Sequence, residues 1–202
     1  MNSNLVKWGV AERQKPGESL SGDLHLVKPL RTGVLLAVAD GIGHGQAAAD
    51  AARLALSAVE ELSNKSLVEI MQDCSRKLQG TRGAVMSMAL LSTLDNTMEW
   101  LGVGNVEGVL VRSAPDGKPA RESLLLSRGV LGGQLPPLRT AALEISRGDT
   151  LVFATDGIQR GFEDNMVLLK GPQETAQFIL ERDGLGTDDA LVLVATFQGR
   201  PQ

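Results

Sequence analysis

The chain has 202 residues, of which 43% are hydrophobic and 22% are charged. This length and balance indicate a globular protein with a sizeable core, and they exclude a disordered chain. Lysine and arginine together number 20 and aspartate and glutamate 24, so the formal net charge is −4. That charge argues against a nucleic-acid partner, because binding to a phosphate backbone relies on an excess of positive charge.

The chain has one cysteine, Cys74, which excludes an internal disulfide and a cysteine-based zinc site. Cys74 falls on the apolar face of an expected helix, so we interpret it as a core thiol rather than a nucleophile. No apolar run is long enough to cross a bilayer, and residues 1–8 lack the apolar stretch of a signal peptide. We therefore expect a cytoplasmic protein with no membrane partner.

The first part of the chain predicts strands followed by two helices. Strands over 4–10 and 24–28 flank a polar turn at 15–19, and the apolar run 34–39 is typical of a strand buried on both faces. An alanine-rich helix over about 45–62 would pack closely against a sheet. A second helix begins at Ser66, where Ser66 and Glu69 form a capping-box pattern.

The second part predicts mostly strands, over 84–91, 98–103, 106–111, 122–126, 151–155 and 190–197. Turn signals stand at Asp95-Asn96 and at 115–117, the sequence Pro-Asp-Gly, and a third helix runs from Pro172 to about Arg182. This succession of strands favours an α+β fold of antiparallel sheets covered by helices over a doubly wound fold. Because no linker or repeat interrupts the pattern, we expect one domain over 1–202.

Acidic residues stand where apolar strands meet loops. They are Asp23, Asp40, Asp156 and the pair Asp188-Asp189. If those strands lie side by side, the carboxylates converge at one end of a sheet, and such oxygen donors select Mg²⁺ or Mn²⁺. The alternative is that each acidic residue merely marks a turn, since Asp-Gly is a common turn signal.

The glycine-rich loop 41–45 is a poor match to a phosphate-binding loop. No Lys-Ser/Thr pair follows it, and Gln46 stands where the dinucleotide fingerprint needs glycine. His44 in this loop could be a ligand or a base, whereas His25 lies in an expected strand and is interpreted as a packed or surface histidine.

Taken together, these motifs resemble those of a known family. The segment 37–45, Ala-Val-Ala-Asp-Gly-Ile-Gly-His-Gly, is similar to the central motif of type-2C metal-dependent serine/threonine phosphatases, and more narrowly of their SpoIIE-type bacterial branch. Further motifs follow the family order: Gly22-Asp23, 102–106, 154–158 and Asp188-Asp189. The short length and the segment 81–84, Thr-Arg-Gly-Ala, resemble the branch's stressosome phosphatases, which are bare catalytic domains.

The resemblance implies a four-layer αββα sandwich, with two antiparallel sheets flanked by helices and two Mn²⁺ or Mg²⁺ ions at one end. Asp40 would bridge both ions, the Gly41 carbonyl and Asp23 would hold one, and Asp156 and Asp188 would hold the other. A water between the ions would attack the phosphorus in line, which gives Asp40 and Asp156 their catalytic role. The implied substrate is a phosphorylated protein, a stressosome scaffold or an anti-sigma antagonist.

Two alternatives and one docking hypothesis accompany this interpretation. A degenerate phosphatase-like binding module is favoured by Leu191, because the family usually has threonine or serine there. A nucleotide-binding α/β protein would use the loop 41–45, against which the long succession of strands counts. For a substrate protein, we predict docking through Arg128 and Arg139 in the irregular stretch 128–139 and Arg160 in the loop 159–165.

Overall fold

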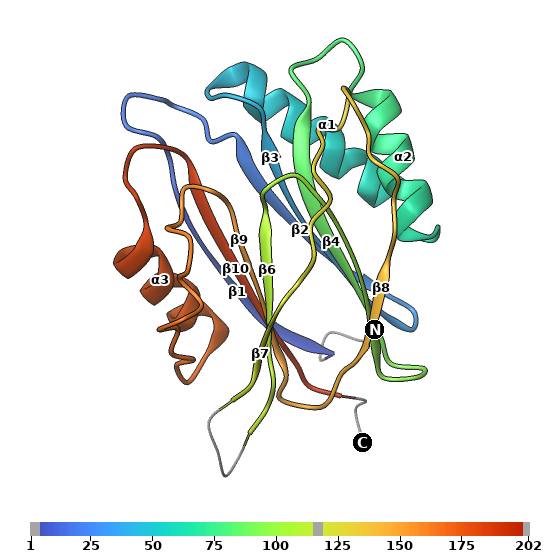
Figure 1. The fold of residues 1–202 in the computed structure, drawn as a ribbon, viewed down its shortest axis with the longest axis vertical. Helices are drawn as coiled ribbons and strands as arrows, with labels where there is room; N and C mark the ends of the chain where they lie inside the picture. Colours follow the sequence, from blue (N-terminus) through green and yellow to red (C-terminus); the bar gives the residue numbers. More distant parts are fainter. Residues whose placement is uncertain (1–4, 115–118, 200–202) are drawn as a thin grey trace.

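Two antiparallel sheets form the centre of the fold in the computed structural model, which describes residues 5–114 and 119–199 (Figure 1). One sheet has the strand order β1 (Val6–Arg13), β10 (Ala190–Phe197), β9 (Thr150–Ala154), β6 (Glu107–Val111) and β7 (Arg121–Ser123). The other has the order β2 (Asp23–Leu30), β3 (Gly33–Gly41), β4 (Ala84–Ser92), β5 (Thr97–Val103) and β8 (Ala141–Glu144). The expected turn at 115–117 lies outside the described residues.

Helices cover the outer face of each sheet. The helices α1 (Gln46–Glu61) and α2 (Leu67–Lys77) lie on the sheet that contains β3, and α3 (Pro172–Asp183) lies on the sheet that contains β10. The result is the expected four-layer αββα sandwich. β3 and β10 are buried along nearly their whole length because a helix covers one face and the opposite sheet the other.

The core consists of three apolar layers. The layer between the sheets contains Trp100 and Phe153, whose rings stack with centroids 5.3 Å apart. A second layer joins α1 and α2 to their sheet, and a third joins α3 to the other sheet. Cys74 on α2 is fully buried in the second layer, and burial raises the pKa of its thiol to about 12, which agrees with its interpretation as a core residue.

Local sequence signals position the two helices next to β3. The side chain of Ser66 accepts a hydrogen bond from the Glu69 amide, and the Glu69 carboxylate accepts one from the Ser66 amide, which completes the expected capping box. At the start of α1, a Cβ on Gly41 would lie 2.0 Å from the carbonyl oxygen of Ala48. Glycine at the end of β3 is therefore what lets α1 approach the strand so closely.

The structure corrects the expectation at two strands. β7 covers only Arg121–Ser123 instead of 122–126, because beyond it the Leu125 carbonyl accepts a hydrogen bond from the Trp100 indole and the Leu125 side chain is 87% exposed. β8 was not expected from the sequence, since it is an edge strand whose side chains are largely exposed and show no apolar alternation. None of the described helices is long and apolar enough to cross a membrane.

Candidate metal centre

Four strands bring their acidic residues to one end of the sandwich. Asp23 at the start of β2 pairs directly with Asp40 near the end of β3 in the antiparallel register. Asp156 lies just after β9 and Asp188 just before β10, and these strands are antiparallel neighbours in the other sheet. Antiparallel pairing therefore brings Asp23 to Asp40 and Asp156 to Asp188, and the stacking of the two sheets places both pairs at the same end. The sequence predicted this convergence if the strands were adjacent.

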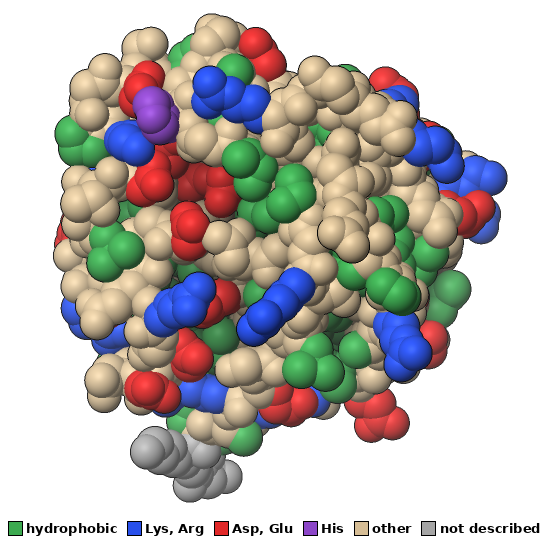
Figure 2. Space-filling view, turned by 45° about the horizontal axis from the view of Figure 1, so that its top comes forward, with side chains coloured by type: hydrophobic (Ala, Val, Ile, Leu, Met, Phe, Trp, Pro, Cys, Tyr) green, Lys and Arg blue, Asp and Glu red, His purple; other side chains and the backbone are tan. Residues whose placement is uncertain are grey.

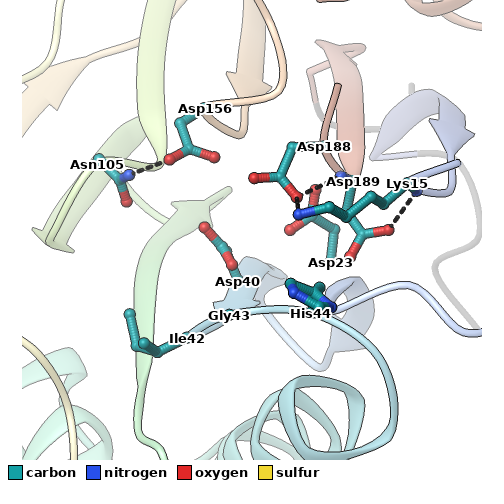
Figure 3. Close-up of a pocket in the computed structure, with 10 residues that line it drawn as sticks. All are labelled: Lys15, Asp23, Asp40, Ile42, Gly43, His44, Asn105, Asp156, Asp188 and Asp189. Carbon is teal, nitrogen blue, oxygen red and sulfur yellow. Dashed lines mark hydrogen bonds and ion pairs between the residues drawn. The ribbon is translucent and has the colours of Figure 1, made fainter. Parts of the chain in front are cut away.

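The carboxylates line a pocket of about 330 Å³ between the ends of the two sheets. In the close-up, Asp40 lies between Asp156 on one side and the group of Asp23, Asp188 and Asp189 on the other (Figure 3). The remaining lining residues are Lys15, Ile42, Gly43, His44 and Asn105. Figure 2 shows the pocket as an acidic hollow, with basic side chains around it on the same face.

Crowding and burial make the ionised forms of these carboxylates costly. Burial, with the charges of Asp23 and Asp156 next in effect, raises the pKa of Asp40 to about 9. Burial also raises the pKa of Asp23 to about 7, although a hydrogen bond from Thr155 acts in the opposite direction. The pKa of Asp156 is raised by burial and by Asp188. Such a pocket favours protons or cations as its occupants.

Each of three carboxylates is held by a nearby protein group. The Asn105 side chain donates to Asp156 at 2.8 Å, the Thr155 hydroxyl donates to Asp23 at 2.7 Å, and Lys15 Nζ lies 3.5 Å from Asp188. Within residues 5–114 and 119–199, no three acidic, histidine or cysteine side chains lie close enough together to form a complete ion site. The assignment of Asp23, Asp40, Asp156, Asp188 and the Gly41 carbonyl as ligands therefore stays a prediction.

The structure distinguishes the two neighbours Asp188 and Asp189. Asp189 is 5% exposed, and its carboxylate accepts the backbone amides of Lys15 at 2.8 Å and Gly22 at 2.9 Å. These two hydrogen bonds hold both ends of the loop between β1 and β2 next to the start of β10. Asp188 has nearly half of its side chain exposed and interacts with the Lys15 ammonium. This division agrees with the choice of Asp188 over Asp189 as a candidate ligand.

The two histidines have different surroundings. His44 lies at the pocket, where its Nδ1 is 2.6 Å from a carboxylate oxygen of Glu18. His25 lies in β2 with its ring centroid 5.8 Å from that of Trp8, outside the residues that line the pocket, and burial lowers its pKa. The interpretation of His25 as a packed histidine agrees with this placement.

Sequence reasoning assigned no role at this site to four side chains that the structure brings to it. Asn105 could have been proposed from the sequence, because it lies in the Gly-Asn segment 102–106 that already belonged to the family motifs. Lys15 and Glu18 carry no such signal, since only the folding of the β1–β2 loop brings them to the pocket. Thr155 precedes Asp156 in a recognised motif, but its hydrogen bond to Asp23 joins residues 132 positions apart.

The donor set fits hard divalent cations. It offers carboxylate and amide oxygens and no thiol, which suits Mg²⁺ or Mn²⁺. In addition, Asn105 Oδ1 is buried without a hydrogen-bond partner among the described residues. An acceptor left without a donor beside four carboxylates is what a cation or its water would satisfy.

The three arginines predicted for docking are all exposed, but they lie in different surroundings. Arg160 is close enough to Asp156 for its charge to lower the pKa of that carboxyl group, against the larger effects that raise it. Arg128 and Arg139 flank a segment that is not wholly a surface loop. Its Leu131 is fully buried and exchanges backbone hydrogen bonds with Ala84 at the start of β4.

Comparison with known proteins supports what the geometry suggests. The family model of stage II sporulation protein E, SpoIIE, matches residues 31–198. The chain belongs to the SpoIIE family. A relative by sequence is the phosphoserine phosphatase RsbX of Bacillus subtilis strain 168, which is 26% identical over 151 residues covering 74% of this chain and 73% of RsbX.

Two solved structures extend this relationship. One is a chain whose structure is described under the bacterial stressosome, a modular system that has been adapted to control secondary messenger signaling. It is 34% identical to this chain and superposes with a TM-score of 0.84, and the match covers 95% of this chain and 100% of that one. The structure of RsbX in complex with magnesium superposes with a TM-score of 0.84 at 22% identity, covering 96% of both chains. The expected family and fold are thus confirmed, and RsbX is a phosphoserine phosphatase, which is the expected functional class.

Proposed function

We propose that this SpoIIE-family chain is a metal-dependent phosphoprotein serine/threonine phosphatase. The observation that carries the proposal is the pocket in which Asp23, Asp40, Asp156 and Asp188 from both sheets face one another. The magnesium bound by RsbX and the phosphoserine activity in its name support the same conclusion. We further propose that residues 1–202 act as a single catalytic domain in the cytoplasm.

The proposed cofactors are two Mn²⁺ or Mg²⁺ ions. Asp40 would bridge them, Asp23 and the Gly41 carbonyl would hold one, and Asp156 and Asp188 would hold the other. When bound, the ions supply an activated water and neutralise charge on the phosphoryl group. The chain's own contribution is to orient these oxygens: Thr155 holds Asp23 and Asn105 holds Asp156, both through hydrogen bonds shorter than 3 Å.

The proposed substrate is a phosphorylated stressosome scaffold or an anti-sigma antagonist. A phosphoserine carries nearly two negative charges at neutral pH, so it is drawn to cations. The basic side chains on the same face as the acidic hollow are suited to receive such a protein (Figure 2). The proposed docking residues are Arg128, Arg139 and Arg160, all of which are exposed.

Phosphate release from a small aryl phosphate tests the chemistry. We expect release with Mn²⁺ and loss of release when chelator is added in excess. A chain that releases no phosphate but binds a phosphorylated partner would instead be a degenerate binding module. A panel of phosphorylated scaffold and antagonist proteins, assayed in the same way, identifies the substrate class.

A further inference from the structure

The hydroxyl of Thr155 lies between the two sheets beside the pocket. Thr155 directly follows β9, and the residue is 2% exposed. Its Oγ1 is 2.7 Å from Oδ2 of Asp23 in the opposite sheet, and it accepts a hydrogen bond from the backbone amide of Leu191 at 2.8 Å. One buried hydroxyl therefore links β10 to a carboxylate at the start of β2.

The hydrogen bonds determine where the hydroxyl proton points. A threonine hydroxyl has one hydrogen and two lone pairs, and the Leu191 amide occupies one of the lone pairs. Of the two possible acceptors, Asp23 Oδ2 at 2.7 Å is much closer than the Leu191 carbonyl at 3.4 Å. The hydrogen is thus directed at the carboxylate, and a hydrogen bond to an ionised acceptor is among the stronger ones.

This contact restrains the rotation of the Asp23 carboxylate. Oδ2 is held by Thr155, whereas Oδ1 accepts no hydrogen bond from any described residue. We propose that Thr155 is a positioning residue, whose hydroxyl holds one oxygen of Asp23 so that the other is presented to a divalent cation in the pocket. The inference rests on the proposed function, because Asp23 is a ligand only in that proposal.

Manganese affinity, measured by titration calorimetry, tests the inference without reference to turnover. We expect Thr155→Val to weaken Mn²⁺ binding by about tenfold to a hundredfold, as is typical when a group that orients a ligand is lost. Thr155→Ser keeps the hydroxyl and should restore affinity to nearly that of the unmodified chain.

Thr150→Val is the matched control. Thr150 is also buried and lies at the opposite end of the same strand, β9, where its hydroxyl is 3.0 Å from that of Thr196. This variant loses an equally buried hydroxyl, yet it should bind Mn²⁺ as the unmodified chain does. A weakening equal to that of Thr155→Val would attribute the effect to general loss of stability and overturn the inference.

A double-mutant cycle with Asp23→Asn separates positioning from structural support. If Thr155 acts through Asp23, Thr155→Val should cause no further loss of Mn²⁺ affinity in the Asp23→Asn background. A further loss of the same size as in the unmodified background would overturn the inference.

Folding of the variant is checked by thermal melting, because Thr155→Val leaves the Leu191 amide without its acceptor. If that variant does not fold, Thr155→Cys replaces it, since a thiol is a much weaker donor than a hydroxyl. Unchanged Mn²⁺ affinity in either folded variant overturns this inference but leaves the proposed function standing. Absence of Mn²⁺ binding by the unmodified chain would overturn the proposed function, and the inference with it.

Discussion

Individual carboxylates in the pocket lie where ionisation of the carboxyl group costs free energy. Asp40 is mostly buried and faces Asp23 and Asp156, so its pKa is raised to about 9. Asp189 differs in its contacts, because its carboxylate accepts hydrogen bonds from two backbone amides. These acidic residues therefore differ in how far nearby protein donors satisfy their carboxylates.

The first prediction concerns Asp40→Asn. We expect Mn²⁺-dependent phosphate release to fall by at least about a hundredfold, because a key electrostatic contact of the reaction is lost. With chelator present, stability should stay equal or rise, because burial and the neighbouring carboxylates make the ionised form of Asp40 costly and asparagine has no ionised form.

Phosphate-release assays and chemical denaturation measure the two effects. Asp50→Asn is the control, because Asp50 is exposed on α1 and pairs only with neighbouring side chains of that helix. It should change neither quantity. Activity of Asp40→Asn close to that of the unmodified chain would refute the bridging role.

The second prediction follows from the raised pKa values of Asp23 and Asp40, about 7 and about 9. In the unfolded chain both carboxyl groups titrate at about pH 4. Between about pH 4 and their raised pKa values, the native state therefore holds more protons than the unfolded state. Metal-free stability should therefore fall as pH rises through this window. Mn²⁺ needs the deprotonated carboxylates, so its stabilising effect should grow with pH.

Melting temperatures with Mn²⁺ and with chelator check this dependence. We expect little difference at about pH 5 and a clear loss of stability with chelator at about pH 8. A metal effect of the same size at both pH values would argue against a site made of carboxylates.

Secondary-structure elements are positioned by signals at their ends. The capping box defines where α2 begins, and the missing side chain of Gly41 lets α1 lie against β3. These contacts set the distance between the helices and the strand that carries Asp40. They stabilise the scaffold without taking part in the chemistry.

The third prediction tests this separation with Ser66→Ala. Loss of the cap should lower the free energy of unfolding by about 1 kcal/mol. Phosphate release under folding conditions should be unchanged, because α2 contributes no side chain to the pocket. Ser57→Ala in the exposed middle of α1 is the control, and there alanine should be neutral or slightly stabilising. Equal destabilisation by both substitutions would contradict the role of the cap.

At the scale of the whole molecule, the acidic pocket exists only because two sheets are stacked. Asp23 and Asp40 belong to one sheet, whereas Asp156 and Asp188 flank strands of the other. The layer of apolar side chains between the sheets keeps the two halves of the pocket in register. The surrounding face then offers exposed basic side chains to a partner (Figure 2).

The fourth prediction concerns the exposed arginines proposed for docking. Replacing Arg128 and Arg139 with alanine should lower kcat/KM for the phosphorylated partner by about tenfold, as the loss of one or two interface contacts does. Hydrolysis of the aryl phosphate should stay unchanged. Arg160→Ala should lower both, since its charge acts on Asp156.

Parallel assays on the two substrates separate docking from chemistry. Arg147→Ala is the control, because Arg147 precedes β9 and lies at the opposite end of the sandwich. If replacing Arg128 and Arg139 with alanine leaves activity on the phosphorylated partner unchanged, the docking surface lies elsewhere.

The sequence alone determined the class of fold, most of the elements and which acidic residues stand at the strand ends that form the pocket. Apolar runs such as 34–39 and the cap at Ser66 are local signals, so they can be recognised before the chain is folded. The motif order supported the family. Edge strands such as β8 were not predicted, because their exposed side chains give the sequence no periodic apolar pattern.

Only the tertiary structure decided which contacts each acidic residue makes. Asp188 and Asp189 both line the pocket, but only the Asp189 carboxylate accepts the Lys15 and Gly22 amides, which a folded loop brings to it. The bond between Thr155 and Asp23 likewise joins residues 132 positions apart. Such contacts have no local signature, because they arise where the ends of two sheets meet in space.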